Sequence, residues 1–344
     1  MEDTECQCQC QDLMKRVMNI NIRRGGDDYF FNRLFSYVNS ELDGNIQGME
    51  QLRGNVYLVE TEDTRFILKG YNDLRKLKIQ EAFASSLRQS GFGSSYGFVR
   101  MNKPLQFEGL YYGCIEYIDQ HENRFDYGLQ ADRDEGIKLL DKFHDHTSLL
   151  ASSYAGMLPR GDLARKWHHR KKEFTTNLQA VHFYVNSAVT GEVLNWAEVS
   201  LKNFDASKRE LEQEQPVILH GDVAHHNFLR SKEGRLYLID YDLISLGPRA
   251  YDMLQYANRI LPFLDWDFES LEKIGHLKKW LGYEAFLHGL LYPADILREW
   301  NRLLREKNHI SPYRLSPLIE MTINQFQQRK KFHDDVTSRL HSWK

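Results

Sequence analysis

The sequence is poor in proline and cysteine and has no long apolar run, and each shortage excludes a class of protein. Eight prolines among 344 residues argue against a long disordered tail. No apolar run approaches the roughly 18 residues of a membrane-spanning helix, and the acidic, polar start at 1–10 does not fit a secretory signal. The net charge of −3 does not favour nucleic-acid binding through bulk positive charge. We therefore expect a globular cytoplasmic protein of about two domains.

Cysteine use fits the same expectation. Cys6, Cys8 and Cys10 alternate with glutamine, a pattern that could be taken for a metal or redox site. However, zinc-binding pairs normally have a two-residue spacer, and no nearby histidine completes a set. The sequence favours a flexible N-terminal segment over residues 1–25. Cys114 lies in an apolar stretch, which predicts a small buried side chain.

The N-terminal third is predicted to contain strands and one helix. The β-prone runs 56–60 and 65–69 are separated by a polar turn and predict a hairpin. Residues 73–90 have helical spacing, with Asp73 as the N-cap and Gly91 at the end. A second strand pair is expected at 96–101 and 110–118, on either side of a turn at Lys103 and Pro104.

After Ile118 the sequence becomes polar, and residues 119–124 are the best candidate for a connection between domains. From there to about residue 213 the pattern is mainly helical, with Ile137, Leu140 and Phe143 on one face of a first helix. Two short strands are expected within this helical part, at 217–219 and 236–239. The remainder, from 251 to 344, is again predicted to be mostly helical.

Three polar residues lie in the segments that follow these two strands, namely Asp222, Asn227 and Asp240. We expect them at the ends of neighbouring strands. Phosphoryl transfer from a nucleotide needs a carboxylate that orients the acceptor hydroxyl, together with oxygen ligands for Mg²⁺. An Asp and an Asn five residues apart on one loop can divide these two tasks, and a second Asp completes the metal site.

The segment His220-Gly-Asp222-x4-Asn227, with the downstream Ile239-Asp240, resembles the signature of the aminoglycoside phosphotransferase and choline kinase superfamily. Protein kinases have the same Asp-x4-Asn spacing in their catalytic loop. The resemblance implies that Asp222 is the catalytic base and that Asn227 and Asp240 hold Mg²⁺. It also implies that His220 packs the loop and that Asp252 braces it.

The resemblance extends to the nucleotide site. It implies that Lys69, at the end of a hairpin strand, holds the α- and β-phosphates of ATP, and that Glu81, in the helix that follows, is its acidic partner. Backbone groups from Glu116 to Ile118 would bind the adenine edge. There is no Gly-x-Gly-x-x-Gly loop before the first hairpin, and the shorter turn at Gly54 and Asn55 would cover the phosphates instead.

The fold implied by the resemblance is α+β and protein-kinase-like, with a small antiparallel-sheet N-lobe and a larger, mainly helical C-lobe. The nucleotide-binding N-lobe would span 26–113, the hinge 114–119, and the C-lobe with the catalytic loop and acceptor site 120–344. The implied activity is transfer of phosphate from ATP, with Mg²⁺, to a hydroxyl group of a sugar, an aminoglycoside-like or a choline-like molecule. The partners would be the nucleotide and this acceptor, with no nucleic acid and no membrane.

Two other functions remain open at this stage. The sequence around Asn227 is most similar to bacterial spore-coat kinases of the CotS type, so the protein is either an enzyme or a catalytically silent part of a spore coat, where coat proteins would be its partners. The residues His225, His226 and Asp242, together with Asp222 and Asp240, suggest a hydrolytic metal centre instead, although their spacing does not support one.

A basic run covers residues 165–172, with the sequence RKWHHRKK. Such a run could bind an anionic substrate, but the sequence favours a solvated helix face. The paired acids Asp240 and Asp242 would point to opposite faces of a strand unless the chain bends between them.

Overall fold

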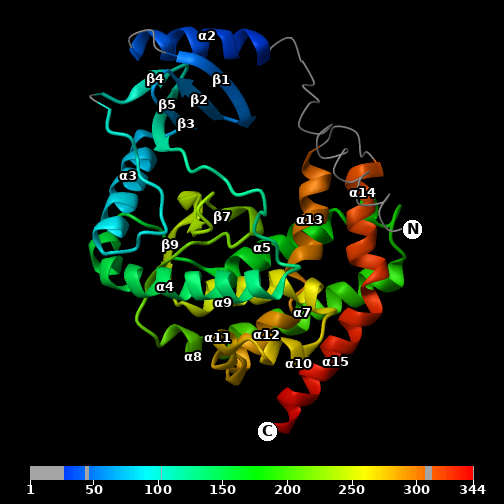
Figure 1. The fold of residues 1–344 in the computed structure, drawn as a ribbon. Helices are drawn as coiled ribbons and strands as arrows, with labels where there is room; N and C mark the ends of the chain where they lie inside the picture. Colours follow the sequence, from blue (N-terminus) through cyan, green and yellow to red (C-terminus); the bar gives the residue numbers. More distant parts are fainter. Residues whose placement is uncertain (1–26, 43–45, 102, 307–311, 344) are drawn as a thin grey trace, which may run out of the picture. The chain divides into compact units, whose positions relative to one another are not determined.

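The computed structural model describes residues 27–42, 46–101, 103–306 and 312–343 (Figure 1). The expectations for Cys6, Cys8 and Cys10 and for the segment 1–25 lie outside these residues. The chain divides into two compact units. The first combines the described chain up to Lys78 with the segment Phe98–Tyr117, and the second combines Ile79–Gly97 with the chain from Ile118 onward. None of the helices in the described ranges has the length and hydropathy needed to cross a membrane.

The first unit is built on an antiparallel sheet with the strand order β1-β2-β3-β5-β4. Its strands are β1 (Ile46–Arg53), β2 (Val56–Thr61), β3 (Arg65–Tyr71), β4 (Leu105–Phe107) and β5 (Leu110–Glu116). The predicted hairpin of β2 and β3 is confirmed, with Leu58 opposite Ile67. Alternate residues such as Val59 and Leu68 are completely buried, because successive side chains of a strand point to opposite faces.

Helix α2 (Asp27–Glu41) covers this sheet, as Figure 1 shows. Leu34 and Val38, one helical turn apart, are completely buried in the same apolar cluster as Tyr57 and Leu105. Burial of each such aliphatic side chain contributes about 1.5–3 kcal/mol to stability. Neither α2 nor β1 was predicted from the sequence.

The predicted strand at 96–101 is wrong. The partners of β5 are β3 and β4, and of the segment 96–101 only Phe98 forms an isolated bridge, with Ile115. Tyr96 of this segment has another role, since it stacks on the buried ring of Tyr241 within the second unit.

The predicted helix at 73–90 is confirmed as α3 (Leu74–Gln89), where the carboxylate of Asp73 accepts a hydrogen bond from the backbone N–H of Arg75 at 2.8 Å. In the second unit, Phe83 of this helix makes edge-to-face contacts with Phe143 and Tyr241.

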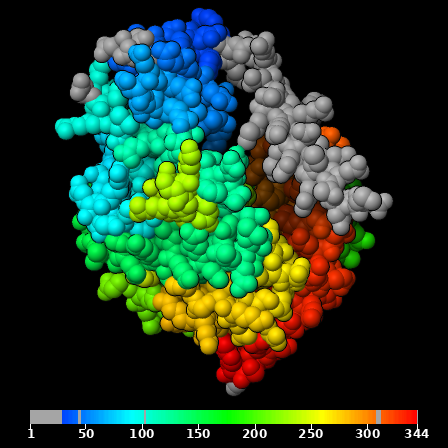
Figure 2. All heavy atoms as spheres, viewed as in Figure 1, coloured from blue at the N-terminus to red at the C-terminus, as the bar shows by residue number. Residues whose placement is uncertain are grey.

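The second unit is mainly helical. Its helices are α4 (Gln130–Tyr154), α5 (Leu163–Thr176), α6 (Leu178–Val181), α7 (Ser187–Ser207), α8 (Arg209–Glu212), α9 (Ala250–Ile260), α10 (Phe268–Glu272), α11 (Gly275–Lys278), α12 (Glu284–Leu291), α13 (Ala294–Arg305), α14 (Pro312–Ile319) and α15 (Phe326–Ser342). The predicted apolar face of the first of them is confirmed, because Ile137, Leu140 and Phe143 are completely buried. In Figure 2 the green surface of α4 adjoins the yellow and orange surface of the chain that follows α9.

Two short antiparallel pairs lie within this helical unit. The first joins β6 (Val217–Leu219) to β9 (Ser245–Gly247), and the second joins β7 (Phe228–Arg230) to β8 (Leu236–Leu238). The predicted strands at 217–219 and 236–239 therefore exist, but they belong to different pairs and are not neighbours in one sheet. Hydrogen bonds within the loops, rather than a shared sheet, bring their polar ends together.

Candidate active site

The loop after β6 has a conformation that only glycine tolerates. Gly221 has φ +79°, and a Cβ at this position would lie 2.3 Å from the carbonyl oxygen of Leu243. The glycine between His220 and Asp222 therefore allows the chain to turn tightly against the segment that follows β8. This turn sets the direction of the Asp222 side chain.

Asp252 in α9 stabilises this turn through hydrogen bonds. Its carboxylate, which is completely buried, accepts hydrogen bonds from the backbone N–H groups of His220 at 2.7 Å and Gly221 at 3.0 Å, and from Nε2 of His144 at 2.9 Å. Burial alone would raise the pKa of Asp252, but its contacts with His144 and His220 outweigh burial and lower the pKa. Asp252 thus braces the loop as an ionised group, in the role implied by the resemblance.

His220 connects the loop to the end of β8. Its Nε2 donates a hydrogen bond to the carbonyl oxygen of Ile239 at 2.9 Å, and its Nδ1 accepts one from the backbone N–H of Asp222 at 3.3 Å. One nitrogen donates and the other accepts, so the geometry assigns a neutral imidazole protonated at Nε2. His220 is therefore a structural residue of the loop, as expected.

Asn227 closes the loop and leaves an oxygen atom available. Its Nδ2 donates a hydrogen bond to the carbonyl oxygen of Asp222 at 2.8 Å, while its backbone carbonyl accepts one from the backbone N–H of Ile239 at 2.9 Å. The side-chain Oδ1 is buried and has no hydrogen-bond partner among the described residues. A buried acceptor without a donor costs free energy, and an oxygen ligand of this kind suits Mg²⁺.

Asp240 directly follows the Ile239 amide that bonds to Asn227. Its backbone is left-handed, with φ 70° and ψ 71°, a conformation that is strained for a residue other than glycine. Asp240 and Asp242 do not lie on a strand, since β8 ends at Leu238 and a short helical turn, η2, begins at Tyr241. Asp242 accepts a hydrogen bond from Nε2 of Gln80 at 2.7 Å and is held there. The chain thus bends between the two acids, and the Ile239–Asn227 hydrogen bond brings the backbone next to Asp240 close to Asn227.

The carboxylate of Asp222 is paired with an arginine that was not predicted from the sequence. Nη2 of Arg259 lies 2.9 Å from Oδ1 of Asp222. Arg259 follows Asp252 by seven residues on α9, so the two share one helical face, and this spacing was the available signal. Burial and the nearby Arg298 lower the pKa of Arg259, while Asp222 opposes that effect.

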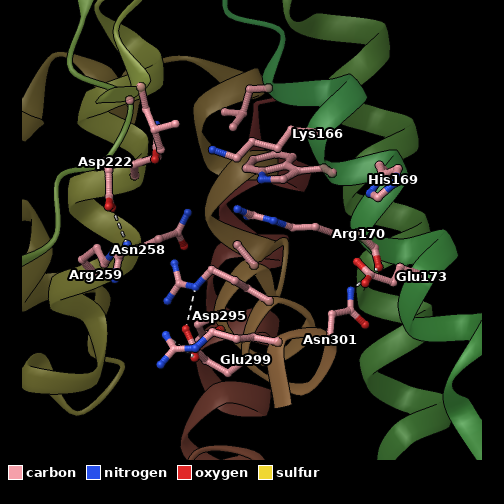
Figure 3. Close-up of a pocket in the computed structure, with 18 of the residues that line it drawn as sticks. Lys166, His169, Arg170, Glu173, Asp222, Asn258, Arg259, Asp295, Glu299 and Asn301 are labelled. Carbon is pink, nitrogen blue, oxygen red and sulfur yellow. Dashed lines mark hydrogen bonds and ion pairs between the residues drawn. The ribbon is translucent and has the colours of Figure 1, made fainter. Parts of the chain in front are cut away.

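A pocket of about 520 Å³ opens beside Asp222, and all of its lining residues belong to the second unit. Figure 3 shows Lys166, His169, Arg170 and Glu173 along α5 on one side and Asp222 with Arg259 on the other. Helix α13 supplies further lining residues, including Arg298 and Glu299. Pockets that bind small ligands usually have volumes of roughly 300–1,000 Å³, so this one has the size for a small acceptor.

Each carboxylate in the lining of this pocket has an arginine partner. Asp222 pairs with Arg259; Glu173 pairs with Arg305 at 3.3 Å; Glu299 pairs with Arg298 at 2.7 Å; Asp295 pairs with Arg329 at 2.6 Å. The negative charges that the lining presents, within the described residues, are therefore all neutralised by the protein itself.

Two basic residues of the pocket lining have no carboxylate partner among the described residues. Lys166 and Arg170 form no ion pair or side-chain hydrogen bond with the described part of the chain. The pKa of Lys166 is lowered by burial and by Arg170, and the pKa of Arg170 is lowered to about 10 by burial and by Arg298. Lys166 is exposed and Arg170 is half-buried, so these two residues keep contact with solvent as predicted for 165–172, and both also line the pocket.

The residues predicted to bind the nucleotide fall in both units. Lys69 on β3 is 8% exposed, and its Nζ lies 5.6 Å from the centre of the Tyr71 ring. Gly54 and Asn55 form the β1–β2 turn, where the Asn55 carbonyl accepts a hydrogen bond from the backbone N–H of Gly70 at 2.8 Å.

The remaining members of that set are placed as follows. Glu116 ends β5 in the first unit, whereas Glu81 on α3 and Ile118 belong to the second unit. The nucleotide-binding roles of these residues and of Lys69, Gly54 and Asn55 stay predictions.

A hydrolytic metal centre gains no support from the structure. Within the described residues, no group of three or more His, Cys, Asp and Glu side chains is arranged to hold a metal ion. A Mg²⁺ site of the kinase type needs fewer protein ligands, since this ion normally keeps several waters and binds substrate phosphates.

Known phosphotransferases share the sequence pattern and the fold of this chain. A model of the phosphotransferase enzyme family matches residues 46–275, well over half of the chain. An aminoglycoside phosphotransferase from Alicyclobacillus acidocaldarius subsp. acidocaldarius has a similar structure, with a TM-score of 0.65 and 17% identity over 87% of this chain and 93% of that chain.

Two further phosphotransferases are similar in structure. The AMP-bound complex of a spectinomycin phosphotransferase has a TM-score of 0.56 and 15% identity, covering 85% of this chain and 96% of that chain. The GDP complex of an aminoglycoside 2'-phosphotransferase-IIIa has a TM-score of 0.55 and 12% identity, covering 86% of this chain and 98% of that chain. These likenesses concern the fold, and they confirm the predicted α+β, protein-kinase-like class.

Proposed function

The chain belongs to the phosphotransferase enzyme family, and on that premise we propose that it transfers the γ-phosphoryl group of ATP to a hydroxyl group of a small molecule bound beside Asp222. The protein is a small-molecule kinase. The observation that carries the proposal is the position of Asp222, whose carboxylate lines a pocket of ligand size while the same loop presents the unpartnered Oδ1 of Asn227.

Asp222 would accept a hydrogen bond from the acceptor hydroxyl and orient it towards the phosphorus atom. As the new O–P bond forms, the bond between the γ-phosphorus and the bridging oxygen breaks, ADP leaves, and the hydroxyl proton passes to Asp222 and then to solvent. Arg259 holds the Asp222 carboxylate in place through an ion pair. Because little covalent chemistry is needed, most of the catalysis would come from positioning and charge neutralisation.

Asn227 and Asp240 would hold Mg²⁺, and the buried Oδ1 of Asn227 fits this role. When bound, the ion would neutralise charge on the phosphates. Lys69, with Glu81 as its acidic partner, would hold the α- and β-phosphates, and Gly54 and Asn55 would cover them.

Backbone groups between Glu116 and Ile118 would bind the adenine edge. The two nucleotide-bound phosphotransferases of similar fold, which hold AMP and GDP, support the use of a nucleotide as donor.

Among the acceptor classes that the sequence suggests, the pocket supports a sugar-like hydroxyl better than an aminoglycoside-like or choline-like one. A cationic acceptor needs carboxylates, and those of the lining already have arginine partners. Sugar hydroxyls can bind to polar and charged groups of either sign.

A catalytically silent role in a spore coat is the alternative, and it rests on the sequence resemblance alone, as do coat proteins as partners. The cytoplasmic location rests on composition. The structure favours the enzyme, because a silent scaffold has no need of an aspartate positioned by an arginine in a ligand-sized pocket.

The melting temperature of the purified protein, with Mg²⁺ and with ATP, GTP or ADP, tests the proposal. A nucleotide present at 100 times its dissociation constant adds about 2.7 kcal/mol to the free energy of unfolding. We expect such a shift in the wild type, its loss in Asp240→Ala, and its retention in Asp335→Ala, which removes an exposed aspartate of α15. No shift with any nucleotide at millimolar concentration would contradict the proposed function and favour the scaffold.

A further inference from the structure

Lys166 and Arg170 are the unusual part of the acceptor pocket. They are four residues apart on α5, hence on one face of the helix, and both side chains extend into the pocket towards the side that holds Asp222 (Figure 3). Neither side chain has an ion-pair or hydrogen-bond partner among the described residues, and both line the same cavity as Arg259 and Arg298. Arg302 and Arg305 line it as well, so six lysine and arginine side chains border one space.

Burial lowers the pKa values of Lys166, Arg170 and Arg259, and repulsion from neighbouring arginines lowers them further. The ion pairs within the pocket do not cancel this repulsion between the cationic side chains. Glu299 is shared between Arg298 at 2.7 Å and Arg302 at 3.4 Å, and Asp222 is held by Arg259. The lining therefore has an excess of positive charge next to Asp222.

We propose that the acceptor is a hydroxylated anion, whose carboxylate or phosphate group binds to Lys166 and Arg170 while its hydroxyl faces Asp222. This inference rests on the proposed function. Arginine matches the planar geometry of a carboxylate or the oxygens of a phosphate with two parallel N–H donors, and lysine adds a point charge. One such group would satisfy both side chains.

The same arrangement selects against other acceptors. An aminoglycoside or choline would bring further positive charge into a space that already repels it. A neutral sugar would leave the two cations without a counterion. The structure thus distinguishes three kinds of acceptor by charge alone, and this difference can be measured on compounds that share one ring.

The test compares glucose, glucosamine, glucuronate and glucose 6-phosphate as ligands of the full-length protein without nucleotide, at constant ionic strength, by isothermal titration and melting temperature. We expect glucuronate, glucose 6-phosphate or both to bind at least about tenfold more tightly than glucose and glucosamine. The anion that binds more tightly identifies the carboxylate or the phosphate as the recognised group.

Three variants locate the effect. Lys166→Met combined with Arg170→Met should abolish the preference for the anion, and Arg170→Lys alone should retain part of it. Lys172→Met, an exposed position on the same helix outside the pocket lining, should leave the preference unchanged. The proposal is wrong if glucosamine binds most tightly, if neither anion binds better than glucose, or if the preference persists in the double variant.

A parallel titration with ADP and Mg²⁺ separates this inference from the proposed function. The double variant should bind ADP like the wild type, because the predicted nucleotide residues lie outside this pocket. Loss of anion preference with intact ADP binding supports the inference. Failure of ADP to bind any of the proteins would contradict the proposed function, and an anion preference that persists in the double variant would contradict the inference on its own.

Discussion

The catalytic loop and the α5 wall of the pocket differ in how they accommodate charge. Asp252 beneath the loop has three hydrogen-bond donors, from His144, His220 and Gly221. Lys166 and Arg170 on α5 have no such partner within the described chain, and their pKa values are lowered. A satisfied charge stabilises the fold, whereas an unsatisfied one is retained for a ligand at some expense of stability.

This contrast separates residues that shape the site from residues that recognise the acceptor. Changes in the loop network should lower stability and activity together. Changes in the α5 wall should alter acceptor binding and leave stability unchanged or slightly higher. Single substitutions in each region can break or sharpen this separation.

The largest effect on stability is expected for Asp252→Ala. It leaves His144 and two backbone N–H groups without their buried partner, and loss of one member of a buried pair costs about 3–5 kcal/mol. Denaturant unfolding measures this change. Asp63→Ala, which removes an exposed aspartate from the β2–β3 turn, should cost less than about 0.5 kcal/mol.

The pH dependence of stability provides a second readout of the same residue. The pKa of Asp252 is lowered in the fold, so its contribution is present above its unfolded pKa of about 3.9 and is lost as the pH falls below that value. The difference in unfolding free energy between wild type and Asp252→Ala should therefore shrink on acidification through this range. A difference that stays constant down to about pH 2 would contradict the role assigned to the ionised carboxylate.

A smaller effect is expected for Arg259→Gln, at the point where the loop and the pocket meet. Arg259 positions Asp222 through a charge-assisted hydrogen bond, so kcat should fall about tenfold while the KM for the nucleotide stays the same. Arg259→Lys should recover part of the rate. An equal loss in both variants with a raised nucleotide KM would indicate a general structural defect instead.

The smallest effect on stability is expected for Lys166→Met. Its lowered pKa means that the fold disfavours the charged form, so its removal should leave the melting temperature unchanged or raise it slightly. Differential scanning calorimetry at neutral pH measures this. A clear decrease in the melting temperature would show that Lys166 stabilises the fold and would weaken the contrast between the two regions.

The part of the site that lies within one stretch of sequence was predictable. His220, Asp222 and Asn227 are close together along the chain, and their spacing alone identifies the loop. The sequence showed only that Asp240 and Asp242 would point to opposite faces unless the chain bends between them. It did not show the bend itself, because a strand pattern does not reveal the left-handed backbone at Asp240. The hairpin of β2 and β3 was also predictable, because its two strands and the turn between them are adjacent in the sequence.

The pocket was not predictable, because α5, α9 and α13 contribute to it from distant parts of the sequence. The run 165–172 has the composition of a solvated helix, and only tertiary packing places its exposed Lys166 and half-buried Arg170 beside a pocket. The strand expected at 96–101 failed in a similar way, since Tyr96 stacks on Tyr241 of a distant segment and only Phe98 forms an isolated bridge with β5.

The central claim is that Asp222 directs phosphate to a hydroxyl acceptor in this pocket. Transfer of radiolabel from γ-labelled ATP to the small-molecule fraction of a cell extract tests it most directly, in wild type and in Asp222→Asn, with ADP affinity measured in both. The account predicts a labelled anionic product whose rate of formation falls about 10²- to 10⁴-fold in the variant, with ADP affinity unchanged. Equal labelling by the two proteins, or no labelled product from a wild type that binds ADP, would contradict it.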